Sequence, residues 1–396
     1  MASVLGFVVV PMLSIASPLL AIPAITSQFG AAGWSAVAVG QSVGASFAVI
    51  LELGWGLTGP QRVARQSQRN RQQTLAIAIS TKLAIVAPLV ALASAASFYL
   101  SADFRWEAAA VAAGATAFGL NSTWYFIGTG SSAKLLYCDA VPRLLCVTVS
   151  AILIFAGGEL ALYPLIGIIL PIGVSGLLVI YAEQLRLSHL RGMTLRRLGL
   201  VVASQSSALS ARALSAIYMS LPITLVSFVA PGAVAVFSAI ERLQRIYLQV
   251  LTAVPNIMQK WVGQSYGQRR KIRRAKKSIF YNAMIGLAAG IGFTVVAPTM
   301  ADIIFASTIK VPIEFTALSG VLIFIVSVSR ASGSIALVAF GRINTVFVSA
   351  AAGTAVGVPS ILLGAKFLGA PGALAGEVLA ELVVLAIQLR EIRRYK

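Results

Sequence analysis

The stretch FSAIERLQRIYLQVLTAVPNIMQ, from Phe237 to Gln259, decides how the rest of this chain is organised. When it is placed on a helix at about 100° per residue, its polar side chains other than Gln244 fall within one arc of roughly 100°. At about 1.5 Å of rise per residue this polar stripe is about 30 Å long, the thickness of the hydrocarbon core of a bilayer. The pattern predicts a membrane-spanning helix with one wet face. The stripe consists of Ser238, Glu241, Arg242, Arg245, Gln249, Thr252, Asn256 and Gln259.

The two arginines of this stripe have two alternative roles. An arginine at bilayer depth costs about 2.5–3.5 kcal/mol on insertion scales, so Arg242 and Arg245 are expected to line a water-filled cavity and to bind something negative. Alternatively, Glu241 and Arg245, which are four residues apart, form a structural ion pair between helices. The ion pair does not explain Arg242 or the neutral polar residues that continue to Gln259, so the cavity is the favoured interpretation.

The composition is that of a polytopic membrane protein. Of 396 residues, 58% are hydrophobic and only 11% are charged, and the mean hydropathy is +0.89. No soluble fold buries so much apolar side chain. The net charge of +19 would suit nucleic-acid binding, but the basic residues collect in short segments between apolar runs, as topology signals do. We therefore expect membrane lipids as partners and no nucleic acid.

Apolar runs of about 18 to 25 residues predict about twelve transmembrane helices. We expect an all-α polytopic membrane protein with two pseudo-symmetric six-helix bundles around a central cavity. The bundles are residues 1–185 and 199–396, and a basic cytoplasmic linker, residues 186–198, joins them. The sequence AVAV, at 36–39 and again at 233–236, opens the second span of each half after a short outer loop that contains glycine. The predicted spans are 4–25, 34–57, 74–99, 106–128, 138–157 and 160–181 in the first bundle, and 199–229, 233–258, 278–301, 313–340, 346–368 and 373–389 in the second.

The basic residues between these spans predict the orientation. Of the 31 lysines and arginines, 23 lie in segments on one side of the predicted membrane and three lie on the other. Because lysine and arginine accumulate in cytoplasmic loops, both termini are predicted to be cytoplasmic.

Apart from Arg143 and Lys366, which are counted above with the two sides of the membrane, five basic residues lie inside predicted spans. Lys82 is placed near the cytoplasmic end of its span, where it either snorkels to the interface or belongs with the others. The other four would together cost about 10 kcal/mol if they faced lipid, which is similar to the stability of a whole domain. A functional role is therefore the default expectation for Arg212, Arg242, Arg245 and Arg330.

Catalytic chemistry has little support in this sequence. The single histidine, His189, lies in the basic linker, and there is no D-x-D pair, no H-E-x-x-H motif and no cysteine cluster. We expect no catalytic residue, no metal site, no cofactor and no enzymatic activity. Glu52 lies near the cytoplasmic end of the second predicted span, where it either pairs with Arg62 or Arg65 or binds a proton or a sodium ion.

Four segments carry a family resemblance. They are GAAGWSAVAVGQSVGASFAVILELGWGLTGPQRVARQ at 30–66, NSTWYFIGTGSSAKLLY at 121–137, the stretch 215–264 with Ala239, Glu241 and Arg242, and Gly341-Arg342 together with GAPGALAGEVLAELVVL at 369–385. They resemble, in order, the second span, the aromatic end of the fourth span, the seventh and eighth spans, and the last two spans of the O-antigen and polysaccharide flippases. That family belongs to the multidrug/oligosaccharidyl-lipid/polysaccharide exporter superfamily. In this chain Ile240 interrupts the A-E-R core of the eighth span.

The resemblance implies a two-lobed fold of twelve to fourteen helices in the bacterial inner membrane. It also implies alternating-access translocation of an undecaprenyl-diphosphate-linked oligosaccharide from the cytoplasmic to the outer leaflet, with polysaccharide polymerase and glycosyltransferases of the same pathway as further partners. Glu52, Arg62, Arg242 and Arg245 fall on matching motif positions. Because arginine forks match phosphate oxygens, the predicted substrate site comprises Arg62, Arg212, Arg242, Arg245, Gln249, Asn256 and Arg330. Glu52 and Glu241 are the candidates for ion coupling.

Two other functions are weighed against this one. A cation-coupled multidrug exporter of the same superfamily is expected to have an acidic cavity, whereas arginines outnumber glutamates among the predicted cavity residues of this chain. A membrane glycosyltransferase or polymerase that acts on lipid-linked sugars needs a sizeable outer loop or paired carboxylates, and neither is visible in the sequence.

Overall fold

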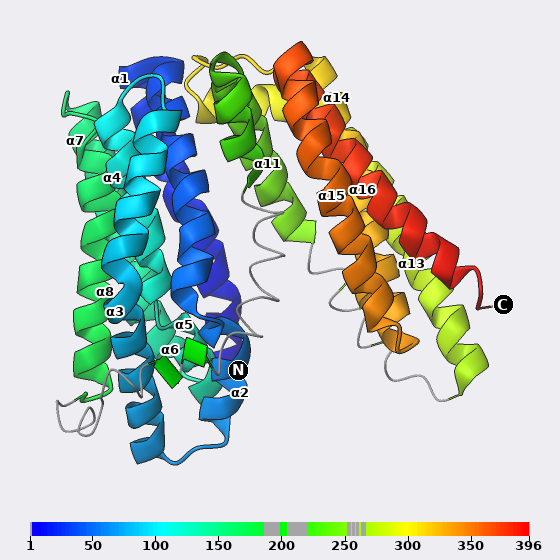
Figure 1. The fold of residues 1–396 in the computed structure, drawn as a ribbon, viewed down its shortest axis with the longest axis horizontal. Coiled ribbons are helices and arrows are strands. Elements are labelled where there is room, and N and C mark those ends of the chain that lie inside the picture. Colours follow the sequence, from blue (N-terminus) through cyan, green and yellow to red (C-terminus); the bar gives the residue numbers. More distant parts are fainter. Residues whose placement is uncertain are drawn as a thin grey trace. The chain divides into compact units, whose positions relative to one another are not determined.

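The structure is a computed structural model, and it divides the chain into two compact units, residues 1–224 and 225–396 (Figure 1). It describes residues 2–185, 199–200, 202–203, 221–251, 255, 258, 261–262 and 267–395, without the side chains of 2–16, 57, 61 and 343. Within these ranges the regular structure is entirely helical. The predicted linker, residues 186–198, lies outside them, so the domain boundaries at 185 and 198 stay predictions.

The predicted all-α polytopic membrane fold is confirmed. Eight helical segments of the described residues are long and apolar enough to cross a membrane, judged by length and composition. The seventh predicted span, 199–229, falls largely outside the described residues. The eighth predicted span is not among these eight segments, because its helix carries three charged side chains in 18 residues.

Helix α1, Ala2–Glu52, joins the first two predicted spans. The expected outer loop between them is a kink at Gly30, whose φ of 63° and ψ of −160° are not helical. A left-handed φ of this kind costs glycine little because it has no Cβ atom. The helix ends before Leu53 and Gly54, which both have positive φ, and α2, Trp55–Ala64, starts again from there. The prediction that the second span continues to residue 57 is therefore wrong.

The fourth predicted span, 106–128, is not one continuous helix, because the chain breaks inside it. Helix α4, Arg105–Ala117, passes into the short 3₁₀ turn η1, Phe118–Leu120, and α5 starts again as Thr123–Thr129. The side-chain oxygen of Asn121 accepts a hydrogen bond from the Thr123 backbone N–H at 2.6 Å. This local hydrogen bond turns the backbone just before α5, and the average hydropathy of an apolar run does not locate such a turn.

Lys82 is buried on α3, Gln68–Leu100, and does not snorkel. Its side chain is 1% exposed, and its Nζ donates a hydrogen bond to the backbone carbonyl of Asn121 at 3.2 Å. The carbonyl group at the break between α4 and α5 is therefore satisfied by the ammonium group of a neighbouring helix.

The rest of unit 1 consists of α6, Ser132–Leu135, the π-helical turn η2, Leu136–Ala140, α7, Val141–Phe155, the π-helical turn η3, Tyr163–Ile169, and α8, Leu170–Ala182. Helices α1, α3 and α4 pack against one another, and α7 packs against α1 and α8 (Figure 1). A Cβ atom added to Gly40 of α1 would lie 2.6 Å from the carbonyl oxygen of Ala108 on α4, so the two backbones are in contact. Small residues allow this close approach between helices in membranes.

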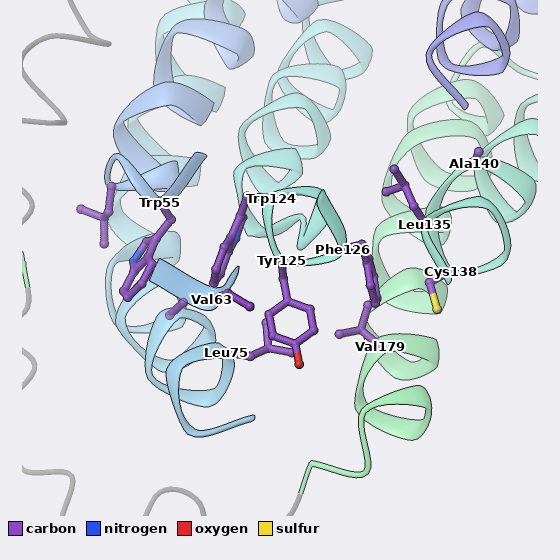
Figure 2. Close-up of a cluster of buried hydrophobic side chains, with 12 residues drawn as sticks. Trp55, Val63, Leu75, Trp124, Tyr125, Phe126, Leu135, Cys138, Ala140 and Val179 are labelled. Atoms are coloured by element: carbon purple, nitrogen blue, oxygen red, sulfur yellow. The ribbon is translucent and has the colours of Figure 1, made fainter. Parts of the chain in front are cut away.

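An aromatic cluster lies where α2, α5 and α8 meet the start of α3 (Figure 2). The rings of Trp55 and Trp124 are stacked, with centroids 5.2 Å apart and an interplanar angle of 28°. Beside them, the Tyr125 hydroxyl donates to Glu183 Oε2 at 2.7 Å, and Lys134 Nζ donates to Glu183 Oε1, also at 2.7 Å. Glu183, just after α8, therefore ties the end of that helix to α5 and α6.

Unit 2 consists of the 3₁₀ turn η5, Pro231–Ala233, and the helices α11, Val234–Leu251, α13, Gln268–Ile304, α14, Ile313–Arg330, α15, Ile343–Leu368, and α16, Ala370–Ile392. The π-helical turn η6, Ala331–Leu337, continues α14. Helix α15 packs closely along α16, and α14 also packs on α16. A Cβ atom on Gly372 would lie 2.0 Å from the carbonyl oxygen of Gly364, so α15 and α16 touch backbone to backbone where they are joined.

Candidate functional site

The candidate site is built around α11, which contains the first half of the polar stripe. Pro231 begins the 3₁₀ turn η5 that leads into this helix, and a proline is well placed at a helical start because its missing N–H would be unsatisfied there anyway. In unit 2, α11 packs against α13, α14 and α16. Its polar residues are therefore distributed between the interior of the unit and the outer surface of the helix.

The prediction that the stripe is wet along its whole length is wrong for its first turns. Ser238 is 1% exposed and Glu241 is 2% exposed, so both face the interior of unit 2. Gln244, from the opposite arc, is also buried. Arg242 and Arg245 are half-buried and Gln249 is exposed. The helical wheel located the polar arc correctly, but it contains no information on which neighbouring helix covers that arc.

Arg245 is held by Glu241 on the same helix. Its Nε donates to Glu241 Oε1 at 3.0 Å, and its Nη2 donates to the same oxygen. The side chain of Arg245 is 42% exposed, whereas that of Glu241 is 3% exposed. The ion pair that we weighed as the alternative is therefore present, although it lies along one helix rather than between two. Part of the Arg245 side chain nevertheless remains accessible.

Arg330, the last residue of α14, reaches the end of α11. Its Nη1 donates a hydrogen bond to the backbone carbonyl of Leu248 at 3.0 Å. Carbonyl groups in the last turn of a helix have no partner within the helix, and cations are stabilised there by the helix dipole. Arg330 also lines a small pocket inside unit 2, together with Leu251, Pro255, Asn282, Ile285 and Ser327.

Two further acidic residues, which the sequence analysis did not select, belong to this site. Glu377 on α16 interacts electrostatically with Glu241 and Arg245, and Glu381, one turn later, interacts with Arg330. Both lie in the GEVLAEL part of a segment that we had used only for its resemblance. Two carboxylates four residues apart in an apolar span were a detectable signal, since they share one face of the helix. The helices α11, α14 and α16 therefore contribute three arginines and three glutamates to this part of unit 2.

Of the remaining predicted site residues, Glu52 and Arg62 lie on helices other than α11, α14 and α16. Glu52 is half-buried at the end of α1, and Arg62 is exposed on α2, with its guanidinium carbon 5.8 Å from the centre of the Trp55 ring. Both belong to unit 1. Arg212 and Asn256 lie outside the described residues, so their roles stay predictions.

Metal ligands do not gather in the part of the chain that the structure describes: it holds no group of three or more histidine, cysteine, aspartate or glutamate side chains that could bind a metal ion. The chemistry that the described cluster offers is therefore that of guanidinium and carboxylate groups. Such groups bind anions through charge-assisted hydrogen bonds, or they bind protons.

Comparison with known proteins identifies the fold. No family model matches the sequence, and no curated protein matches it either. Among solved structures, an inward-facing multidrug resistance MATE family transporter of the MOP superfamily is similar over 98% of this chain and 95% of its own, with a TM-score of 0.70 and 14% identity. The lipid II flippase MurJ in an inward closed conformation is similar over 99% of this chain and 87% of its own, with a TM-score of 0.71 and 11% identity. At these identities the likeness establishes a shared fold.

Proposed function

We propose that this protein is a flippase that moves an oligosaccharide linked to a lipid diphosphate, with undecaprenyl as the lipid, from the cytoplasmic to the outer leaflet of the bacterial inner membrane. The observation that carries the proposal is the pair Arg242 and Arg245 on α11. These two half-buried arginines lie on a helix whose neighbours are membrane-spanning helices, and 42% of the Arg245 side chain is accessible although it is paired with Glu241.

The chemistry of the cargo fits these arginines. A diphosphate cannot cross hydrocarbon unaided, and the planar guanidinium fork binds phosphate oxygens in a bidentate manner. Arg330 extends the basic surface to the end of α11, and Gln249 offers a neutral hydrogen-bonding group on the exposed side of the same helix. The lipid tail remains in the bilayer while the head group is transferred. The fold shared with a protein described as a lipid II flippase supports this proposal.

A second candidate, a cation-coupled multidrug exporter, is favoured by one specific observation. Glu377 and Glu381 add two carboxylates to the membrane-spanning part of unit 2, so the excess of arginines over glutamates at the candidate site is smaller than the predicted cavity residues alone indicate. The fold is also that of a protein described as a multidrug resistance transporter. Carboxylates at membrane depth suit cationic substrates or coupling ions.

Expression of this protein in two bacterial hosts distinguishes the two candidate functions. In a host that lacks its own polysaccharide flippase, the flippase proposal predicts restored surface glycan. In a host that lacks its drug exporters, it predicts unchanged resistance to cationic dyes. Restored dye resistance without surface glycan, at normal abundance of the protein in the membrane, would establish the second candidate instead.

The orientation of the chain gives a further prediction. Since 23 of the 31 basic residues lie on one side of the predicted membrane, both termini are expected to be cytoplasmic. A reporter that is active only in the cytoplasm should therefore be active when fused after Lys396 and inactive when inserted in the turn between α7 and η3, at Gly157–Glu159. Activity at both positions would contradict the predicted topology.

A further inference from the structure

Helix α13 is longer than a membrane span, and the part in excess is basic (Figure 1). Its 37 residues give a length of about 55 Å, whereas the hydrocarbon core of a bilayer is about 30 Å thick. The segment from Ser278 to Ala301 contains no charged residue and is long enough to cross that core. The ten residues of the helix before Ser278 contain seven lysines and arginines and no carboxylate. These ten residues therefore extend about 15 Å beyond the apolar part of the helix.

The basic residues nearest to the apolar part continue its exposed face. At about 100° per residue, Arg273, Lys276 and Lys277 are exposed within the same arc of about 100° as four exposed apolar side chains that follow them. These four are Phe280, Met284, Leu287 and Ile291. On the opposite side of the helix, Ala275 and Ser278 are fully buried. The exposed face of α13 is therefore first basic, then aromatic and then aliphatic.

This order is that of a phospholipid, whose phosphate group lies outside its acyl chains. Lys276 and Lys277 precede Phe280 by about 4–6 Å along the helix axis, which is within the head-group layer of about 5–7 Å on each side of the hydrocarbon core. Arg269 and Arg270 precede Phe280 by about 15–17 Å and so lie beyond that layer. The face therefore places two lysines at the depth of the lipid phosphate groups.

The cations of this face are available to a ligand. In the part of the chain that the structure describes, none of Arg273, Lys276 and Lys277 pairs with a carboxylate. Arg274, beside the face, is engaged instead: its Nη1 donates to the Trp261 carbonyl at 2.9 Å, and its guanidinium carbon lies 5.2 Å from the centre of the Trp261 ring. Trp261 is 36% exposed, and tryptophan is enriched at membrane–water interfaces. A second part of the chain thus indicates the same depth.

We infer that the exposed face of α13 binds an anionic phospholipid. Lys276, Lys277 and Arg273 hold the phosphate group, and the acyl chains lie along Phe280 and Met284. A zwitterionic phospholipid is disfavoured because its own cationic group would be repelled by these three side chains. A soluble anion would leave the adjoining apolar face uncovered, whereas acyl chains cover it. This lipid site goes beyond the proposed function and is independent of it, since a flippase and a drug exporter could each carry it.

The position of the site is tested on the wild-type protein in nanodiscs. The probe is phosphatidylglycerol with a photoactivatable group near the head-group end of one acyl chain, and the reference is phosphatidylcholine with the same group at the same mole fraction. We expect phosphatidylglycerol to label the segment 280–287 several times more strongly than phosphatidylcholine does. Equal labelling of this segment by both lipids, or labelling by neither, would overturn the inference.

The role of the lysines is tested by binding of phosphatidylglycerol to the purified protein in detergent, measured by native mass spectrometry. Lys276→Gln with Lys277→Gln should weaken binding about thirtyfold, because each basic residue at an anionic lipid surface contributes about fivefold. Lys276→Arg with Lys277→Arg keeps both charges and should bind as the wild type does.

The matched control is Arg269→Gln with Arg270→Gln, which removes two cations from the same helix outside the head-group layer. It should bind phosphatidylglycerol within about twofold of the wild type, since charges further than a Debye length of about 10 Å are largely screened. Equal weakening in the two glutamine variants would show attraction to the net charge of the segment and would overturn the site. If the Lys276→Gln, Lys277→Gln protein does not insert into the membrane, the labelling of the wild-type protein decides alone.

Discussion

Replacing both Arg242 and Arg245 by alanine is expected to reduce glycan export by about a hundredfold or more, at unchanged abundance of the protein. Each arginine that loses its charge-assisted hydrogen bonds to a phosphate group costs about 1.5–3 kcal/mol, or roughly a ten- to hundredfold loss of affinity. Arg245→Lys should rescue export only partly, because lysine keeps the charge and loses the planar fork. The measurement is surface glycan in a host without its own flippase, normalised to the amount of this protein in the membrane.

The matched control for this prediction is Arg269→Ala with Arg270→Ala. Both residues are exposed at the start of α13, so the variant removes two arginines without touching the cluster and should export normally. A purely structural ion pair predicts a different pattern: Arg245→Ala alone would lower the abundance of the protein, and adding Glu241→Ala would restore it. Full export by a normally abundant Arg242→Ala, Arg245→Ala protein would reject an anion site on α11.

The second large effect is expected at Gly372, where α15 and α16 touch. A Cβ atom there would lie 2.0 Å from the carbonyl oxygen and 2.5 Å from the carbonyl carbon of Gly364, and neither is part of a side chain that can rotate away. The two helices must separate to accept even alanine. Overpacking lowers the free energy of unfolding by about 1–3 kcal/mol. Because the new methyl group would meet rigid backbone, we expect Gly372→Ala to lower it by about 3 kcal/mol. For a unit of this size we expect a fall of roughly 6–12 °C in the melting temperature of the purified protein.

Gly173 and Gly176 on α8 offer the control for this change. Nothing lies within 4 Å of a Cβ atom added at either position. Alanine should therefore leave the melting temperature unchanged or raise it slightly, because alanine is about 0.5–1 kcal/mol better than glycine within a helix. If the melting temperature of Gly372→Ala were the same as that of these control variants, the close contact of α15 and α16 would not contribute to stability.

The hydropathy of the chain was sufficient to predict most of the long helices, and the reason is physical. The third, ninth, eleventh and twelfth predicted spans each lie within one helix, because lipid selects for apolar side chains on every exposed face. The structure places α3, α13, α15 and α16 there. The kink at Gly30, the break after Glu52 and the new start at Thr123 depend on backbone angles and on one local side-chain hydrogen bond. These features barely change hydropathy, so the apolar runs could not predict them.

The candidate site was only partly predictable, because helical periodicity gives the face of a residue and not its neighbours. Helical periodicity correctly predicted that Glu241, Arg242 and Arg245 lie on one face of α11. It could not show that α14 and α16 cover part of that face. Glu377 was missed for a different reason. The balance of arginines and glutamates among the predicted cavity residues does not reveal that a carboxylate far along the chain interacts electrostatically with Arg245.

The most direct measurement of the central claim is flipping by the purified protein in proteoliposomes. A fluorescently labelled undecaprenyl-diphosphate-linked oligosaccharide is placed in both leaflets, and an impermeant quencher added outside reports how fast the inner pool becomes accessible. We predict that the wild-type protein exposes the inner pool much faster than protein-free liposomes do, and that the Arg242→Ala, Arg245→Ala protein does not. Exposure no faster than in protein-free liposomes, by a wild-type protein that moves a cationic dye across the same membrane, would contradict the proposal.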